Sequence, residues 1–541
     1  MQFSRREILK GMGAAGITPL LISACSSSGG DGGTMLPELP ELPVYQWDGP
    51  IGPENLFEHG VASGDPLPEG VILWTRVTPE ASEPVEVWWE MALDEGFLER
   101  TAQGTFTTDA SRDYTVKVDV PGLIWGRNYF YRFAVQGRWS PTGRTRLAPK
   151  GNGATQLRFG VCSCSNYGFG YFHAYRHMAA RADLDAIVHL GDYTYEYQNG
   201  QYPTFEEQLR PVEPENETVT LEDYRIRLSL YRRDPDLQEC HRQHPFIVVW
   251  DDHETANNSW MGGADNHDPE TEGPWSDRLA AGRQAFFEWI PIRENSGQQL
   301  YRTLKYGDLA DIIMLDTRIE GREQQFSAIV APSDAALPAN IISAEQEAWL
   351  QDQLVNSTAK WRVIGNQVIV SLLQLSNPDG TTSIINTDLW HGYPEGRERL
   401  LTFFRTNDIS NTVFITGDVH SSWAIDVTFG DGSYDPATRD GAICGEFVAP
   451  GITAPNSPAL AGLANRVGPQ IRYQEGESNG YFVLDVQADK VQADWYLLDG
   501  VDIDEGAETL DASWAVLDGR KHVTEMDSPE APSGQAPPAA S

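Results

Sequence analysis

The chain has 541 residues and is strongly acidic, because 78 Asp and Glu against 40 Lys and Arg give a formal net charge of −38. This charge excludes a general basic surface for nucleic acid or anionic lipid, so we expect no specific nucleic-acid partner. Five cysteines in this length exclude a disulfide scaffold. An anionic substrate would therefore need a local centre of positive charge.

The first residues predict an export signal. Residues 4–10 read SRREILK, and a mild apolar run over residues 12–22 follows, too short to span a bilayer. Adjacent arginines before such a run indicate export by the twin-arginine machinery. An ordinary secretory signal with two arginines by chance is the alternative. The twin-arginine route carries folded proteins, often with their cofactor. The signal is therefore a first hint that the protein acquires a metal before export.

Cys25 follows small residues at the end of the signal peptide, residues 1–25, in a pattern similar to a lipobox. We expect its lipidation to provide the protein's membrane contact, although a simple cleavage site beside a cysteine is the alternative. Residues 26–48 are rich in Ser, Gly and Pro and predict a linker. Residues 527–541 are rich in Pro, Ala and Ser and predict a disordered tail.

Residues 49–149 predict a small β-sandwich domain of immunoglobulin or fibronectin type, because short alternating runs are separated by Gly, Pro and Asp turns. We find no catalytic constellation in it. The expected strands are residues 71–76, 85–90, 114–118 and 129–133.

Residues 150–526 predict a layered α/β domain, in which short apolar strands alternate with helical segments. Ser343 and Gln346 are typical of a capping box at the start of one helix. The expected strands are residues 157–161, 186–190, 246–250, 311–315, 361–370 and 413–416, and the expected helices are residues 171–181, 278–289, 343–354 and 395–405.

Chemically active residues follow four of these strands directly. The segments are CSCSN at 162–166, GDYTY at 191–195, DDHE at 251–254 and GDVH at 417–420. Ligands of α/β folds bind beyond the carboxyl ends of the strands, so these side chains are expected on one rim. Thiol, phenol, imidazole and carboxylate groups together indicate a site for more than one metal ion. Each segment alone has an ordinary alternative, such as a hydrogen-bonded turn or a buried histidine, but their joint occurrence favours the metal site.

The segments 191–195, 252–254 and 417–420 resemble the Gly-Asp-x-x-Tyr, Gly-Asn-His-Glu and Gly-His-x-His motifs of calcineurin-like metallophosphoesterases. The cysteine after the first strand and the Gly-Asp-Val-His variant narrow the resemblance to the PhoD-like alkaline phosphatases. It extends over about residues 50–500 and implies a layered α/β domain with a β-sandwich core flanked by helices.

The resemblance implies an enzyme that uses Fe³⁺ and Ca²⁺. The implied iron ligands are Cys164, Asp192, Tyr195 and His420. The implied calcium ligands are Asp192, Asp252 and Asp418, and the ligands of a second calcium stay open. Thiolate and phenolate suit Fe³⁺ and carboxylate oxygens suit Ca²⁺, so the donor chemistry agrees.

His253 is the expected catalytic residue, because its imidazole could stabilise the transition state or protonate the leaving oxygen. Asn258 and Asn366 are further polar candidates for supporting the site or binding substrate. His391 is a third, at a position where the family commonly has an acidic residue. Cys162 is the alternative to Cys164 as the thiol ligand.

We therefore expect an exported hydrolase of phosphomonoesters and phosphodiesters, monomeric and located in the periplasm or on the cell surface, in which a metal-bound hydroxide attacks phosphorus. Bound cations would also attract phosphate despite the charge of −38. A purple-acid-type phosphatase with an iron–zinc or iron–manganese pair is the alternative enzyme. A surface lipoprotein that binds phosphopolymers without turnover is the alternative outside enzymes. The natural substrate and the roles of Cys240 and Cys444 stay open.

Overall fold

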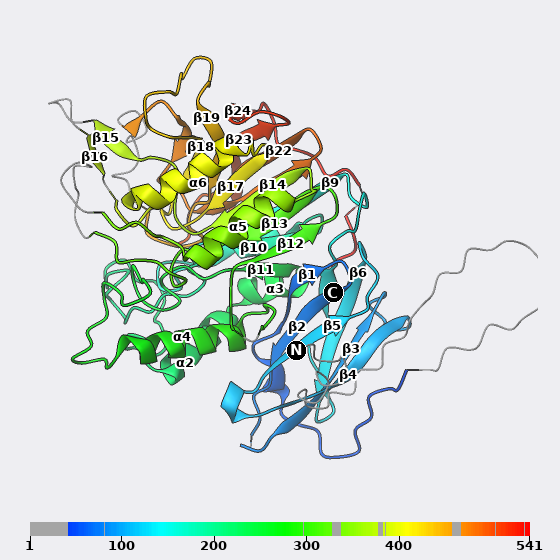
Figure 1. Ribbon diagram of the computed structural model, residues 1–541. Coiled ribbons are helices and arrows are strands. Elements are labelled where there is room, and N and C mark those ends of the chain that lie inside the picture. The colour runs from blue at the N-terminus through cyan, green and yellow to red at the C-terminus, as the bar shows by residue number, and fades with distance from the viewer. Residues whose placement is uncertain are drawn as a thin grey trace, which may run out of the picture.

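Two large β-sheets packed face to face form the centre of the molecule in the computed structural model (Figure 1). One sheet has ten strands in the order β24-β23-β22-β21-β9-β10-β11-β1-β2-β5, and the other has seven in the order β12-β13-β14-β17-β19-β18-β20. The structure describes residues 42–541 except 81, 296, 327–336, 377–381, 385, 457–466, 504 and 535. The predicted signal peptide, with Cys25, and most of the predicted linker lie outside this part.

The six strands predicted for the α/β domain are parallel within each sheet, and four of them directly precede the predicted motifs. In the ten-stranded sheet they are β9 (Gln156–Cys162), β10 (Ala186–His189) and β11 (Pro245–Val248). In the seven-stranded sheet they are β13 (Ala310–Met314), β14 (Trp361–Asn366) and β17 (Thr412–Thr416). Their carboxyl ends therefore lie along one edge of each sheet. We predicted each strand to within a few residues, except that β14 ends at Asn366 rather than at residue 370.

The remaining strands complete these sheets and the sandwich of the N-terminal part, except that β15 and β16 pair with each other in a separate two-stranded sheet. They are β1 (Val61–Leu67), β2 (Gly70–Arg76), β3 (Val85–Ala92), β4 (Arg100–Thr108), β5 (Thr115–Pro121), β6 (Asn128–Val135), β7 (Arg138–Trp139), β8 (Gly143–Arg146), β12 (Arg302–Tyr306), β15 (Gln374–Ser376), β16 (Thr382–Ile384), β18 (Ser422–Thr428), β19 (Ala442–Val448), β20 (Ile471–Glu475), β21 (Gly480–Gln487), β22 (Lys490–Leu498), β23 (Glu508–Leu517) and β24 (Val523–Glu525).

Side chains that alternate along the strands of the seven-stranded sheet contribute to two hydrophobic cores, one on each face of the sheet. On β17, Val413 and Ile415 belong to the large cluster between the sheets, whereas Phe414 belongs to the cluster under the helices. β13 behaves in the same way, with Ile312 toward the other sheet and Ile313 away from it. Successive side chains of a strand point to opposite faces, so a fully apolar strand serves both layers.

Helices cover the outer faces of the sheets. α5 (Ala344–Asn356) and α6 (Pro394–Thr406) pack on the seven-stranded sheet, while α1 (His173–Ala180), α2 (Leu221–Arg232), α3 (Pro235–Gln243) and α4 (Trp275–Trp289) lie with the other sheet (Figure 1). Short 3₁₀ helices in the described residues are η2 (Glu54–Phe57), η3 (Ala110–Arg112) and η4 (Trp390–Gly392). None of the helices in the described part of the chain combines the length and apolar character needed to cross a bilayer.

We did not predict α2 and α3. α2 buries Arg227 and Arg232 on its inner face, and Arg227 donates to backbone carbonyls, so its apolar periodicity is weak. The predicted capping box of α5 is only half present. Ser343 accepts from the backbone N–H of Gln346 at 3.0 Å, but the Gln346 amide instead bonds the backbone of Asp316.

The N-terminal part is the predicted β-sandwich, with one sheet formed by β3, β4 and β6–β8 and the other by β1, β2 and β5. The sequence pattern did not reveal that β1 also pairs in parallel with β11, at Ser63 with Pro245 and Gly64 with Phe246. One sheet of the sandwich is therefore continuous with the ten-stranded sheet, which joins the N-terminal part rigidly to the centre.

The C-terminal segment, which we expected to be disordered, instead contacts the folded body. The Arg158 guanidinium donates to the carbonyl of Glu530 at 2.9 Å, and the Gln243 amide donates to the carbonyl of Ala540 at 2.8 Å. The backbone N–H of Ser541 donates to Glu95 at 2.6 Å. A proline-rich segment forms no regular element here, yet its backbone groups are satisfied by side chains of the body.

Replacement of Gly64 by Ala should destabilise the protein, because the added Cβ would clash with the carbonyl oxygens of Pro291 and Phe246 at the junction of β1 and β11. Overpacking of this kind costs about 1–3 kcal/mol, which thermal or chemical denaturation would detect. Gly534→Ala is the control, because no atom lies within 4 Å of its added Cβ. Equal stability of the two variants would contradict the close packing of this junction.

Candidate metal centre

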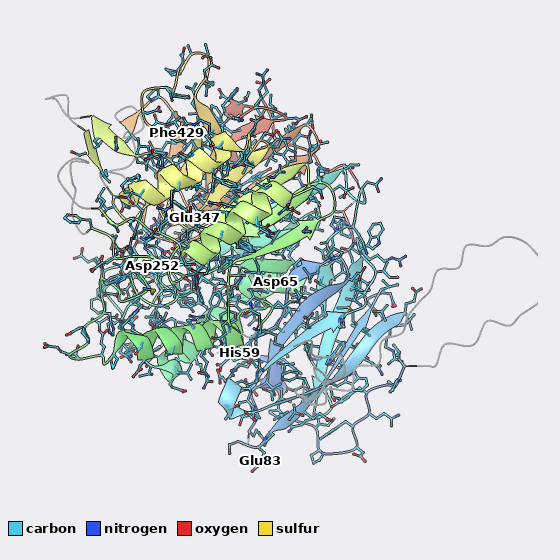
Figure 2. All side chains as sticks on the ribbon, in the orientation of Figure 1. His59, Asp65, Glu83, Asp252, Glu347 and Phe429 are labelled. Atoms are coloured by element: carbon cyan, nitrogen blue, oxygen red, sulfur yellow. The ribbon has the colours of Figure 1, made fainter. Side chains whose placement is uncertain are left out.

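The predicted site residues gather where the carboxyl ends of the parallel strands meet. Loops after β9, β10 and β11 come from one sheet, and loops after β13 and β17 come from the other. A backbone bridge between Ser163 and Gly451 joins the two sides. Asp252 marks this region in Figure 2, far in that view from Glu83 in the N-terminal part.

Four of the six predicted metal ligands have a left-handed backbone. The φ angles are 61° at Cys164, 56° at Asp192, 70° at Asp418 and 50° at His420. Residues other than glycine rarely adopt this backbone conformation. They cluster at functional sites, where the surrounding structure holds them in it. The sharp turns let each strand end direct its next polar side chain toward the same point.

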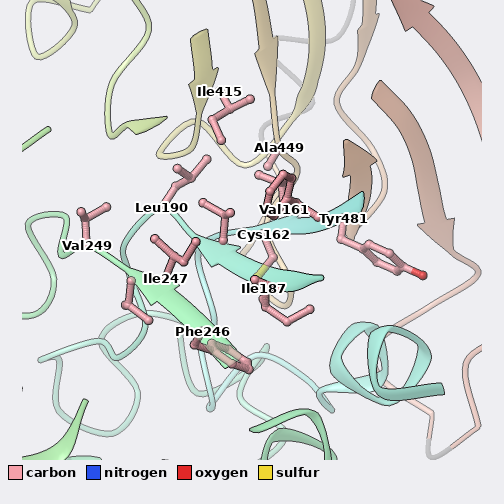
Figure 3. Close-up of a cluster of buried hydrophobic side chains, with 14 of the residues drawn as sticks. Val161, Cys162, Ile187, Leu190, Phe246, Ile247, Val249, Ile415, Ala449 and Tyr481 are labelled. Atoms are coloured by element: carbon pink, nitrogen blue, oxygen red, sulfur yellow. The ribbon is translucent and has the colours of Figure 1, made fainter. Parts of the chain in front are cut away.

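A first cluster contains the predicted iron ligands. Ligand atoms of Cys164, Asp192 and His420 lie within 4.8 Å of one another. The Tyr195 hydroxyl donates to Asp192 Oδ2 at 3.0 Å and lies 3.1 Å from His420 Nε2. Cys162 instead lies in the apolar core between Val161, Ile187 and Ile247 (Figure 3). The structure thus places Cys164, and not Cys162, in the cluster.

The protonation of this cluster prepares it for a cation. His420 Nδ1 lies 2.9 Å from the carbonyl of Pro455, which can only accept, so Nδ1 holds the proton and Nε2 has a free lone pair. Burial, and then the charge of Asp192, raise the pKa of Cys164 and of Tyr195 well above their ordinary values. A bound cation would reverse this effect and hold the thiol and phenol deprotonated.

A second cluster contains Asp252 and Asp418, two of the three predicted calcium ligands, together with Asp251 and a buried arginine. The third predicted ligand, Asp192, lies instead within 4.8 Å of ligand atoms of Asp252 and His253. Carboxylate oxygens of Asp251, Asp252 and Asp418 lie within 4.8 Å of one another. The Arg318 guanidinium is fully buried and donates to Asp388 at 2.6 Å, to Asp418 at 2.7 Å and to Asp251, and it lies 3.3 Å from Asp252. Buried carboxylates require such pairing.

The charges of this cluster remain only partly balanced. Burial, and repulsion from Asp388 and Asp252, raise the pKa of Asp418 to about 7, although Arg318 opposes the shift. Burial also disfavours the charge of Asp252, but Arg318 and His253 outweigh it and lower that pKa to about 2. Asp252 Oδ1 has no hydrogen-bond partner among the described residues. Hard oxygen donors with excess negative charge fit a divalent cation such as Ca²⁺.

His253 is oriented by a carboxylate that we did not predict. Its Nδ1 lies 2.7 Å from Glu196 Oε2, and its ring stacks on Tyr195 at 4.3 Å between centroids. Glu196 is fully buried and also accepts from the backbone N–H of Asn257 at 2.7 Å. Burial disfavours a charged His253, but Asp252, Glu196 and Asp192 outweigh it and raise its pKa well above 6.5. Glu196 is adjacent to the predicted GDYTY segment, which is the signal that could have indicated it.

Glu254 ties two of the site loops together. Its carboxylate accepts from the backbone N–H groups of Asp251 at 2.8 Å, Asp192 at 3.2 Å and Tyr193 at 2.6 Å. These groups belong to the loops after β10 and β11. Because the three donors are backbone groups, Glu254 fixes the positions of the loops themselves.

The three further candidates lie outside the clusters. Asn258 acts through Asp252, to which its backbone N–H donates at 2.5 Å. Asn366 is buried and accepts from the indole N–H of Trp390 at 3.0 Å, so it supports a loop. His391 lines a separate cavity of about 390 Å³ with Arg397 and Phe429, among others. Asp388, three residues before His391, is acidic, and its carboxylate accepts from the Arg318 guanidinium at 2.6 Å.

The comparisons with known proteins agree with this arrangement. Residues 159–495 match the PhoD-like phosphatase family, and residues 50–149 match the N-terminal domain of PhoD-like phosphatases. Alkaline phosphatase D of Bacillus subtilis (strain 168) is 36% identical over 442 residues, which are 78% of this chain and 72% of that protein.

Two solved structures support the fold. A structure of PhoD is 31% identical, with a TM-score of 0.81, over 91% of this chain and 95% of that chain. A purple acid phosphatase from yellow lupin (Lupinus luteus) seeds is 12% identical, with a TM-score of 0.52, over 85% of this chain and 73% of that chain, and shares the fold. Since the family match includes the site loops of both sheets, the chain belongs to the PhoD-like phosphatase family and is a phosphoester hydrolase.

Proposed function

We propose that the protein is an exported phosphoesterase that uses Fe³⁺ and Ca²⁺ to hydrolyse phosphomonoesters and phosphodiesters. The observation that carries the proposal is the pair of adjacent clusters with different donors. One combines the Cys164 thiol with the Tyr195 phenol and His420, and the other is made of carboxylates. Thiolate and phenolate donors favour Fe³⁺, whereas carboxylate oxygens favour Ca²⁺.

Asp192 would contribute to both ion positions, because its carboxylate lies near both Cys164 and Asp252. Cys164, Asp192, Tyr195 and His420 would hold iron, and Asp192, Asp252 and Asp418 would hold calcium. When bound, such ions supply a nucleophilic oxygen at moderate pH and offset the charge of the phosphate. These cations would explain how a chain of net charge −38 binds an anionic substrate.

His253 is the proposed proton donor to the leaving oxygen. With its Nδ1 held by Glu196 at 2.7 Å, its Nε2 is directed toward the metal centre, 3.9 Å from Asp252. The surrounding carboxylates favour the protonated imidazole, which is the form that can donate. Glu196 acts on the reaction through His253 by fixing the direction of its ring.

We also propose that the twin-arginine machinery exports the folded protein and that lipidated Cys25 anchors it in the periplasm or at the cell surface. The SRREILK segment at residues 4–10 and the lipobox-like residues before Cys25 support this proposal.

The proposed function predicts calcium-dependent turnover of p-nitrophenyl phosphate and bis-p-nitrophenyl phosphate at alkaline pH. Selective removal of calcium should lower kcat at least about 10-fold while iron is retained, and added Ca²⁺ should restore it. Disturbing only the surroundings of a catalytic metal already costs about 10- to 100-fold in activity, so loss of the ion itself should cost no less. Metal analysis by mass spectrometry accompanies the assay. Full activity with an iron–zinc or iron–manganese pair and no calcium would favour the purple-acid type of site.

The purified protein should be coloured, because a phenolate or thiolate donates charge into Fe³⁺ and gives a visible absorption band. Tyr195→Phe should shift or weaken the band, and Cys164→Ser should do so or lose iron. Cys162→Ser is the matched control and should leave the band unchanged, because that thiol lies in the apolar core. Loss of colour only in the Cys162 variant would show that the wrong thiol was assigned.

His253→Ala should lower kcat by about 10²–10⁴-fold with metal content unchanged, because it removes proton transfer. Glu196→Gln should have a smaller effect, about 10–100-fold, because it disturbs only the orientation of His253. Glu270→Gln at an exposed position is the control. Loss of iron or calcium from the His253 variant would instead make His253 a ligand.

Export can be followed by fractionation of cells that produce the full chain. Arg5→Lys combined with Arg6→Lys should leave the precursor in the cytoplasm, because the paired arginines are what the export receptor reads. Cys25→Ser should be exported but released from membranes. Recovery of the unmodified wild-type protein in a soluble exported fraction would contradict the lipid anchor.

A further inference from the structure

Two tyrosines beside the metal centre have no role in the chemistry described above. Tyr197 and Tyr202 lie in the loop after β10, with ring centroids 5.3 Å apart. The His253 ring lies 5.3 Å from Tyr197 and 6.5 Å from Tyr202, and it is nearly parallel to the latter at 13°. Both tyrosines therefore flank the proposed proton donor.

Both rings are only half-buried and pack against the cluster of Cys164, Tyr195 and Ala454. Tyr202 also lies near the ion positions, because its hydroxyl is 3.5 Å from His420 Nδ1 and its ring is 6.0 Å from that of Tyr195. Part of each tyrosine thus remains accessible next to the residues that would hold iron.

The structure supplies other groups to hold this loop in place. The Arg227 guanidinium donates to the carbonyls of Tyr195 and Tyr197, and the Asn166 amide donates to the carbonyl of Tyr202 at 3.3 Å. All three bonds are made to backbone carbonyls and not to tyrosine hydroxyls. These bonds hold the loop through its backbone, so they do not require the side chain of Tyr197 or Tyr202.

The position of His253 determines where the leaving group departs. If His253 protonates the leaving oxygen, the alcohol part of the ester extends from that oxygen past the neighbouring side chains. Three tyrosine rings lie beside His253: that of the proposed iron ligand Tyr195 and those of Tyr197 and Tyr202, which have no ligand role. Aromatic faces bind planar rings better than saturated groups of similar size, because the ring quadrupoles attract in offset or edge-to-face arrangements.

We propose that Tyr197 and Tyr202 determine specificity by binding the alcohol part of the ester on their ring faces, so that esters with an aromatic or heterocyclic ring near phosphorus are favoured. This inference rests on the proposed function, from which it takes His253 as the proton donor.

The test compares benzyl phosphate with cyclohexylmethyl phosphate, whose alcohols are similar in size and acidity but differ in the planarity of the ring. In the metal-loaded wild type, kcat/KM should favour the benzyl ester by about 2- to 12-fold, the range expected for one aromatic contact. Tyr197→Leu and Tyr202→Leu should reduce this ratio toward one. Tyr197→Phe and Tyr202→Phe are the matched controls and should retain it, because they keep the ring and lose only the hydroxyl.

Calorimetric binding of benzylphosphonate and cyclohexylmethylphosphonate to the same proteins gives a readout without turnover. Tighter binding of the benzyl compound, lost in the Leu variants and kept in the Phe variants, is the expected result. Circular dichroism and iron content identify a Leu variant that has not folded, and the wild-type ratios test the proposal without any variant.

The outcomes separate this inference from the function on which it rests. Hydrolysis of both esters by the wild type with a ratio near one, or with a ratio that both Leu variants preserve, would overturn the role of the rings alone. Ring-dependent binding of benzylphosphonate without hydrolysis of either ester would overturn the proposed function and leave the binding role standing.

Discussion

A single buried positive charge connects the two halves of the metal centre. Arg318 follows β13 of one sheet, and its guanidinium reaches Asp251 and Asp252, which follow β11 of the other. It also bonds Asp388 and Asp418, so that one rigid, always-charged group joins loops from four parts of the chain. Buried carboxylates this close together would repel one another without it, and the loops that carry them depend on this pairing.

The same constraint explains how an acidic protein can hold an acidic site. Arg318 balances only part of the charge around it, since the pKa of Asp418 stays raised to about 7 despite the contact. Oxygens of Asp251, Asp252 and Asp418 lie within 4.8 Å of one another beside this single guanidinium, an arrangement that fits a divalent cation. Net charge over the whole chain therefore says little about the field at the site, because fixed charges and bound ions dominate over short distances.

Buried glutamates complete the arrangement by acting on the backbone and on one side chain. Glu254 accepts three backbone N–H groups from neighbouring loops, and Glu196 holds His253. The left-handed φ angle of Asp192 persists because such bonds over-determine its loop, and the backbone N–H of Cys164 is held by the carbonyl of Gly191 at 3.1 Å. Rigid loops on parallel strand ends in turn hold the ligand atoms at short mutual distances, and a preformed site of this kind costs less to order when an ion binds.

The sequence by itself determined the fold class, the parallel strands and the residues that follow them, because these depend on local alternation and on short motifs. Asp192, Asp252 and His420 were predictable since the carboxyl ends of parallel strands must share an edge. Tertiary structure alone decided the partners of these residues: Arg318 lies 66 to 67 positions from Asp251 and Asp252, and no periodicity relates such segments. The tertiary structure also places His391 in a cavity separate from the metal centre. Charge pairing across two packed sheets depends on their relative position, which a linear pattern does not encode.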